Sequence, residues 1–172
     1  EGPQALFDEH RLSNYVVFGV KYLILPTSQQ PQVPADLIMQ NGPYSLYQVR
    51  DVGYLSLMSI SGSVDVNKAT ISLQSGVALR SDFIERHVDT AVNYPRADTS
   101  VVLPTYFPSQ AIGTINQQKV DWTNGTVDAM VTMNEPGSLV VSTSYDPDWQ
   151  VFVDGQLAQT QMVSPALLSV PV

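Results

Sequence analysis

Residues 112–172 are divided by turn signals into short segments of alternating apolar and polar residues, and this pattern limits the fold more than any other. The alternation is clearest in residues 126–133 and 149–153, where every second side chain is apolar, as in a strand with one buried face. Turn sequences separate these segments: Asn124-Gly125, Glu135-Pro136-Gly137 and Asp154-Gly155. We therefore predict strands throughout this part of the chain.

The predicted fold is mainly β, of the α+β class, and has two units. Short strands at this spacing predict an antiparallel β-sandwich or jelly-roll-like unit for residues 101–172. We expect this unit to be truncated at its C-terminal end, because the chain stops at Val172 within an apolar run. Residues 1–100 are predicted to form a small α/β unit with one or two short helices. The pattern leaves open whether the two units form one compact domain.

The secondary structure of the first unit is predicted from its apolar runs and its turn residues. Strands are expected near residues 20–25, 44–50 and 54–60, and a further short strand at 101–103. A short helix is expected within residues 5–19, ending at Gly19, and a helical turn at 35–39. A second helix is predicted near residues 82–93, because its apolar residues fit one helical face: Phe83, Ile84, Val88, Ala91 and Val92.

Charge and composition exclude several classes of function. The chain of 172 residues has a net charge of −8, and its eight Lys and Arg residues are scattered. A nucleic-acid-binding protein needs clustered cations that displace counterions from phosphates. No glycine-rich phosphate loop occurs either. We therefore expect neither nucleic acid nor a nucleotide as a partner.

The sequence contains few of the residues from which catalytic and metal sites are usually built. The chain has no Cys, and its two histidines, His10 and His87, lie far apart. Thiolate sites, zinc sites and histidine-based triads are therefore not expected. We predict no catalytic residue, no metal ligand and no cofactor.

One segment does combine aromatic and acidic residues, and it supplies the candidate ligand-binding residues: Tyr145, Asp146, Asp148, Trp149 and Asp154. A sugar ring can stack on an aromatic face while carboxylates accept its hydroxyl hydrogens, and carboxylates also suit calcium. The alternative interpretation is structural. Asp-Pro and Asp-Gly are turn sequences, and Trp149 would fill the core. We favour the structural interpretation.

The same segment carries a resemblance to a known family. A strand of Leu and Val leads into Tyr145-Asp146-Pro147-Asp148-Trp149, followed by alternating residues and Asp154-Gly155. This run resembles the C-terminal extracytoplasmic region of YfhO-like bacterial membrane proteins, which are polytopic and related to the GT-C class of lipid-linked-sugar glycosyltransferases. The family usually has Gly where this chain has Asp148. The segment Phe18-Gly19-Val20-Lys21-Tyr22-Leu23-Ile24 is similar to a strand found early in such soluble regions.

The resemblance implies a non-catalytic domain at the extracytoplasmic face of the bacterial cell membrane. It would be covalently continuous with transmembrane helices of a parent protein that resembles a glycosyltransferase. We expect it to position a glycan acceptor or a partner, with a cell-envelope glycan as the expected ligand. One alternative is a carbohydrate-binding or adhesive β-sandwich of a cell-surface protein. A second alternative is a secreted hydrolase.

Overall fold

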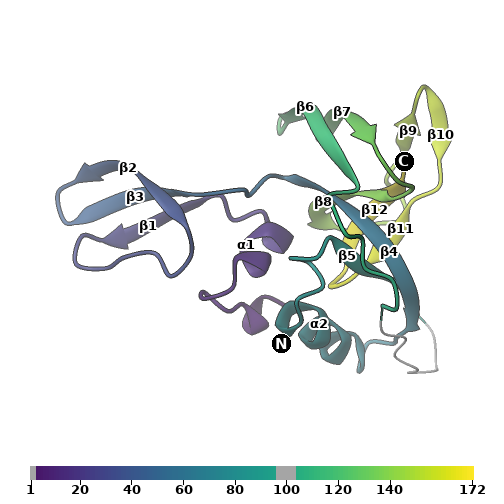
Figure 1. Ribbon diagram of the computed structural model, residues 1–172, viewed down its shortest axis with the longest axis horizontal. Coiled ribbons are helices and arrows are strands. Elements are labelled where there is room, and N and C mark those ends of the chain that lie inside the picture. Colours follow the sequence, from purple (N-terminus) through teal and green to yellow (C-terminus); the bar gives the residue numbers. More distant parts are fainter. Residues whose placement is uncertain (1–2, 96–103) are drawn as a thin grey trace.

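The strands of the computed structural model form a five-stranded barrel and three smaller antiparallel sheets (Figure 1). The structure describes residues 3–95 and 104–172. The first elements are η1 (Pro3–Leu6), α1 (Leu12–Phe18), β1 (Tyr22–Pro26), β2 (Ala35–Asn41), β3 (Tyr44–Val49), β4 (Leu55–Asp65), α2 (Ile71–Arg80) and β5 (Val88–Asn93). They are followed by β6 (Gly113–Asp121), β7 (Thr126–Met133), β8 (Ser138–Ser144), β9 (Val151–Val153), β10 (Gln156–Ala158), β11 (Gln161–Val163) and β12 (Leu167–Pro171).

The barrel has the strand order β11-β12-β8-β4-β5 and closes where Val163 of β11 pairs with Ala91 of β5. Its neighbours are antiparallel except β4 and β5, which are parallel. Parallel neighbours need a crossover connection, and α2 lies in that connection. Side chains of α1, α2 and the barrel share one apolar cluster, with Val17, Met58, Leu79, Val140 and Val163 among its members.

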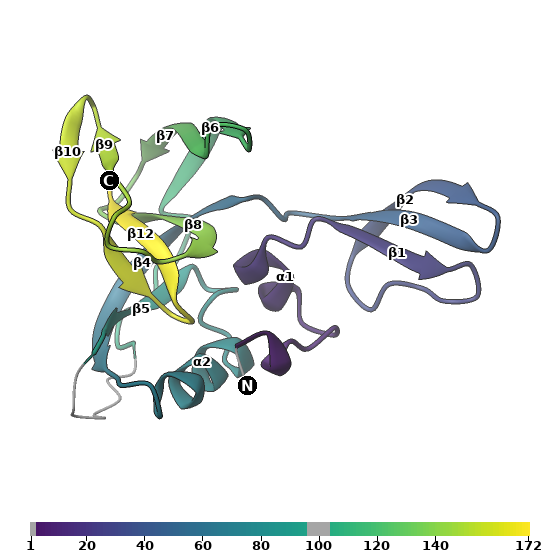
Figure 2. The same cartoon turned by 180° about the vertical axis from the view of Figure 1, so that it is seen from behind.

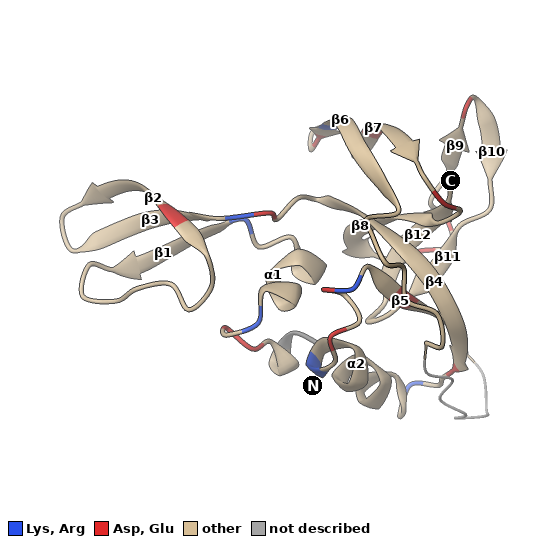
Figure 3. Ribbon diagram, in the orientation of Figure 1, with Lys and Arg blue, Asp and Glu red and all other residues tan. Residues whose placement is uncertain are grey.

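The sheet β1-β3-β2 projects from the barrel, and both views show it as a separate arm (Figures 1 and 2). At its base, Val49 packs with Tyr15 of α1 in a second apolar cluster. The strand register puts Tyr22, Ile24 and Pro26 on the opposite face, beside Tyr44 and its alternate neighbours. Ile24 there is 71% exposed. Few charged residues lie on this arm (Figure 3).

The remaining two sheets are the hairpins β6–β7 and β9–β10. The second hairpin turns at Asp154-Gly155, where Val153 pairs with Gln156 and both turn residues have positive φ, 51° and 77°. A two-residue turn of this kind matches the twist of the strands that it joins. The hairpin predicted from Asp154-Gly155 is therefore confirmed.

The predicted mainly β class is confirmed, but the finer architecture is not. The strands of the C-terminal unit do not form a sandwich or jelly roll of their own, since β8, β11 and β12 complete a barrel with β4 and β5. The barrel thus draws strands from both sides of the predicted boundary at residue 100, and the division into units 1–100 and 101–172 stays a prediction. The strand predicted at 101–103 lies outside the described residues.

Two helical predictions were wrong. Residues 82–93 do not form a helix: turns lead to β5, and the helix of this region is α2, one segment earlier. β5 is buried on both faces, with Val88, Asp89 and Thr90 all in the core. A strand buried on both faces has no alternation, so its apolar spacing can imitate that of a helix. Residues 35–39, predicted as a helical turn, belong to β2.

The strands predicted near 20–25, 44–50 and 54–60 correspond to β1, β3 and β4. The predicted short helix corresponds to α1, which ends at Gly19 in the left-handed conformation. Gly19 donates its backbone N–H to the carbonyl groups of Tyr15 and Val16. Glycine tolerates this conformation best, which is why the sequence predicted the end of the helix.

Candidate functional site

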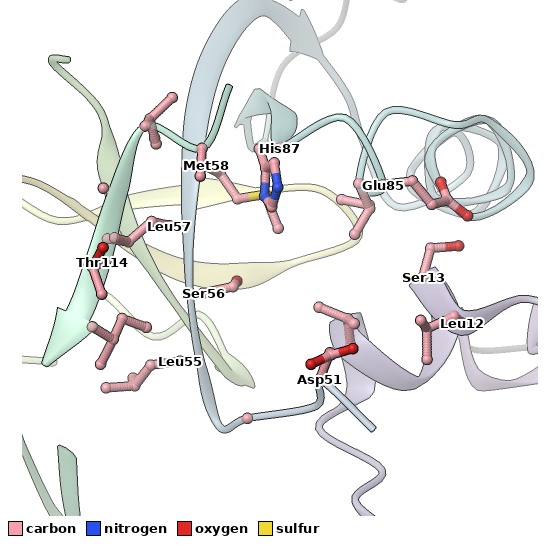
Figure 4. A pocket seen from close by; sticks show the side chains of 17 residues that line it. Leu12, Ser13, Asp51, Leu55, Ser56, Leu57, Met58, Glu85, His87 and Thr114 are labelled. Atoms are coloured by element: carbon pink, nitrogen blue, oxygen red, sulfur yellow. The ribbon is translucent and has the colours of Figure 1, made fainter. Parts of the chain in front are cut away.

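A pocket of about 660 Å³ lies between α1, the start of β4, the turn before β5 and the start of β6 (Figure 4). This volume is in the range of small-molecule sites, roughly 300–1,000 Å³. Its walls are mainly aliphatic: Leu12, Val16, Leu55, Leu57, Met58, Ile84, Ile112 and Ile115. The pocket therefore offers apolar surface to a ligand of modest size.

Two contacts, one on each side, shape this pocket. The Ser142 hydroxyl of β8 donates a hydrogen bond to the Val16 carbonyl at 3.2 Å, which fixes α1 against the barrel. On the other side, β6 starts at Gly113, where a Cβ atom would lie 2.6 Å from the Thr132 carbonyl oxygen. Only glycine allows β6 to lie so close to β7 at this point. Both pocket walls are thus held by contacts between distant segments.

Six of the lining residues have polar side chains: Ser13, Asp51, Ser56, Glu85, His87 and Thr114. Ser13 is 2% exposed, and its Oγ has no hydrogen-bond partner among the described residues. Asp51, Glu85, His87 and Thr114 are exposed and lie at the rim, and Ser56 is half-buried. In Figure 4, Ser13 and Glu85 lie on one side of the pocket, across from Leu57 and Thr114.

The backbone is unusual at two of these rim residues. Asp51 has a φ of 58° and His87 a φ of 56°, in the left-handed region that side chains with a Cβ rarely adopt. Asp51 lies in the segment between the projecting sheet and the barrel, and His87 directly precedes β5. The His87 carbonyl accepts a hydrogen bond from the Ser59 N–H at 2.8 Å, which holds this turn on β4. Such strain tends to occur at binding sites.

Within the residues that the structure describes, no group of three His, Asp or Glu side chains is arranged to hold a metal ion. In the same ranges, no helix is long and apolar enough to cross a membrane.

The five candidate residues from the sequence lie elsewhere in the fold. Tyr145 and Trp149 are half-buried and pack against the cluster of Leu55, Val141 and Leu168. The Asp146 carboxylate accepts the backbone N–H of Asp148 at 2.9 Å, and so closes a local turn.

Asp154 is separate from this turn and occupies the tip of the β9–β10 hairpin. The structure thus brings four of the candidates together in one turn and leaves the fifth, Asp154, in another. Tyr145 and Trp149 thus have a role in packing, and Asp146 and Asp154 have a role in turns.

The sequence interpretation missed the pocket and the more exposed tryptophan. Trp122, at the end of the β6–β7 hairpin, is 74% exposed and meets the Tyr54 ring edge-on, with ring centroids 5.1 Å apart. Its position beside the turn sequence Asn124-Gly125 could have indicated that Trp122 is exposed. No local signal pointed to Ser13 or Glu85, because the pocket joins segments far apart in the chain.

A second buried polar group lies outside the pocket. Asp89 of β5 is 3% exposed, and its carboxylate accepts the N–H of Thr90 at 2.7 Å. Burial, opposed by hydrogen bonds from the backbone of Thr90 and Ser164, raises the pKa of Asp89 well above its usual value. This carboxyl group therefore loses its proton less readily in the folded protein than in the unfolded chain.

Comparisons of the chain with protein-family models, with curated proteins and with solved structures found no match. The pocket and the exposed Trp122 are the surface features on which a proposal of function can rest.

Proposed function

We propose that this chain is a non-catalytic binding domain at the extracytoplasmic face of a bacterial membrane, and that its pocket holds the ligand. The observation that carries the proposal is the pocket itself, with a volume of about 660 Å³ and mainly aliphatic walls. Concave, mainly apolar pockets of this size are the usual place for a small-molecule ligand.

Binding is favoured over hydrolysis by the arrangement of the polar side chains. A nucleophile and its base need a hydrogen bond of about 2.6–3.2 Å. In the described part of the chain, no hydrogen bond joins Ser13 to Glu85 or His87. Carboxylates at the rim and a serine on the wall can orient a bound molecule without this contact.

The membrane setting rests on the resemblance to YfhO-like proteins. Its motif residues have structural roles here: Tyr145 and Trp149 in an apolar cluster and Asp154-Gly155 in a hairpin turn. A scaffold of that kind would suit an accessory domain. The native gene product should sediment with membranes and resist extraction by alkaline carbonate. Recovery in the soluble fraction would contradict the membrane proposal and leave the pocket proposal standing.

Ligand binding can be tested with a variant that fills the pocket. Ala111 is exposed at the rim, so Ala111→Trp should block the entrance without disturbing the core. Ala129→Trp, on the exposed part of β7, is the matched control. We expect 1-hexanol to shift the NMR signals of pocket methyl groups in the natural protein and in the control, but not in Ala111→Trp. Equal shifts in all three proteins would contradict the proposal.

Glycan recognition is a second candidate, and it is favoured by Trp122. An exposed indole can stack on a sugar ring, and neighbouring polar groups can bind the hydroxyls. Beside it, the Asp121 carboxylate accepts hydrogen bonds from the backbone N–H groups of Thr123 and Asn124. Titration with cell-envelope oligosaccharides should then change tryptophan fluorescence in the natural protein but not in Trp122→Phe. No change in the natural protein would rule out this candidate.

A further inference from the structure

We infer that the projecting arm, the sheet β1-β3-β2 of residues 22–49, is a surface that contacts the headgroup layer of a phospholipid bilayer. The inference concerns the arm and not the pocket, and it rests on the membrane setting of the proposed function. Three observations carry it: an open apolar face, the near absence of charge, and an exposed apolar area too small for a stable protein complex.

One face of the arm is covered and the other is open. Ser45, Tyr47 and Val49 of β3 are buried, and Val49 packs with Val33 of the connection between β1 and β2. Side chains alternate along a strand, so the residues between these three lie on the other face. That open face has four large apolar side chains that are more than half exposed: Tyr22, Ile24, Met39 and Tyr44.

The exposed side chains form one continuous surface. The register places Ile24 of β1 and Met39 of β2 on either side of Leu46 on β3. Tyr44 lies on the same face next to the turn between β2 and β3, opposite Pro26. Residues directly opposite each other on neighbouring strands are close enough to touch. The apolar surface therefore extends across all three strands of the arm.

The arm has almost no charge, in contrast to the whole chain (Figure 3). Of the 28 residues 22–49 only Asp36 is charged, whereas the chain has a net charge of −8. The Asp36 carboxylate is hydrogen-bonded to the Arg50 guanidinium, which compensates its charge. A partner recognised by charge would find no complementary group here. An uncharged apolar surface fits a neutral, zwitterionic headgroup layer, because little hydration of charged groups is lost on contact.

The residue types and the sheet edges indicate how deeply the arm would enter. Tyr22 and Tyr44 each combine an apolar ring with a polar hydroxyl, and tyrosine is enriched where membrane proteins meet the headgroups. β1 and β2 are the edges of the sheet, and among the residues described no further strand pairs with them. Unpaired backbone groups are costly in hydrocarbon. The arm should therefore stop at the headgroup layer, where water still reaches its edges.

A second copy of the chain fits this face less well than a bilayer does. A stable protein interface takes about 800 Å² from each partner. An aromatic side chain offers about 150–250 Å², so each of the four half-exposed side chains supplies on the order of 100 Å². Together they fall short of one side of a stable dimer. A bilayer needs no matching surface, and each apolar side chain that leaves water contributes by itself.

The test is cosedimentation of the 172-residue chain with sucrose-loaded vesicles of phosphatidylcholine. We expect binding that does not increase when phosphatidylglycerol is added and does not weaken when the salt concentration is raised, because the arm is uncharged. Binding that requires phosphatidylglycerol and low salt would contradict the inference. No binding to either kind of vesicle would overturn it and leave the proposed function standing, which carbonate extraction and the pocket variant test separately.

A matched pair of variants makes the test specific for the arm. Ile24 on the arm and Leu157 on β10 are exposed to the same degree, 71% and 70%, so neither substitution disturbs the core. Ile24→Glu should lower the affinity for vesicles at least about tenfold, because it removes an inserted side chain and adds a charge. Leu157→Glu adds the same charge elsewhere and should change the affinity less than about twofold. Equal losses would contradict the inference.

Methionine methyl NMR locates the contact. Met39 on the arm is 54% exposed, and Met130 on β7 is 61% exposed. In phosphatidylcholine bicelles, a lipid with a nitroxide on its headgroup should broaden the Met39 methyl signal and leave the Met130 signal unchanged. Equal broadening of both would contradict the inference.

Sedimentation without lipid decides between a bilayer and a second copy. We expect the natural chain and Ile24→Glu to sediment alike, as monomers. A dimer of the natural chain that dissociates in Ile24→Glu would show that a second copy covers this face, and would overturn the inference.

Discussion

The Ser142 hydroxyl and the Val16 carbonyl are joined by a hydrogen bond of 3.2 Å across 126 positions of the chain. The bond fastens the last turns of α1 to β8, and Val16 is also a wall of the pocket. Directly after α1, Gly19 lies so close to β8 that a Cβ atom would approach the Ser142 Cβ to 3.1 Å. The position of α1, and with it the shape of the pocket, therefore depends on this contact.

Gly19→Ala should destabilise the protein for two reasons: the φ of 61° and the close approach to Ser142. Gly125→Ala is the matched control, because Gly125 has a φ of 65° but no atom within 4 Å of an added Cβ. The backbone cost, about 1–2 kcal/mol, should be common to both variants. We expect urea unfolding to show a larger loss for Gly19→Ala. Equal losses would mean that the structure relieves the close contact with Ser142 at no cost in the free energy of unfolding.

Ser13→Ala should stabilise the protein or leave its stability unchanged. The change removes a buried hydroxyl without a partner among the described residues, and alanine is a better helix former within α1 by roughly 0.5 kcal/mol. Thermal unfolding measures the effect.

Ser75→Ala is the control for this change. The Ser75 hydroxyl does have acceptors, the carbonyl groups of Ile71 at 2.8 Å and Pro165 at 3.2 Å. Its loss should therefore destabilise the fold by about 1 kcal/mol. A Ser13→Ala protein destabilised as much as Ser75→Ala would mean that the Ser13 hydroxyl does have a hydrogen-bond partner in solution.

Local signals in the sequence predicted several elements correctly. The turn Asp154-Gly155 and the end of α1 at Gly19 could be predicted because each depends on the conformational preferences of one or two residues. The β7 strand could be predicted because one face of it is more buried than the other, so alternation survives in the sequence.

Other features depend on contacts that no local pattern records. β5 is enclosed on both faces, so its sequence lost the alternation on which strand prediction relies. Closure of the barrel requires the pairing of Val163 with Ala91 across 72 positions. The pocket brings Ser13, Asp51 and Glu85 together from three separate segments. Tyr145 and Trp149 stood out in the sequence because they are aromatic, although their packing is what explains them.

Asp89 should make stability depend on pH in an unusual direction. Its pKa is raised in the folded state, chiefly by burial, so the folded protein holds a proton that the unfolded chain has released. Where the unfolded state binds fewer protons, the free energy of unfolding falls as the pH rises. The contribution of Asp89 is therefore fully present below the ordinary aspartate pKa, about 3.9, and is lost as the pH rises toward the raised value.

Urea unfolding of the natural protein and of Asp89→Asn at a series of pH values measures this contribution. The amide is neutral at every pH, so the variant should lack this decline, and the stability difference between the two proteins should change with pH. Curves that run parallel over the whole range would show that the carboxyl group at position 89 does not titrate differently in the two states.

The two tryptophans should differ sharply in their effect on stability. Trp149 is half-buried against Leu168 and its neighbours, so Trp149→Ala should cost about 2–4 kcal/mol, somewhat less than for a fully buried tryptophan. Trp122 is largely exposed and contacts Tyr54 edge-on, so Trp122→Ala should cost no more than about 1 kcal/mol. Urea unfolding monitored by circular dichroism compares the two without relying on tryptophan emission. A larger loss for Trp122→Ala would contradict the packing of Trp149 in its apolar cluster and the exposure of Trp122.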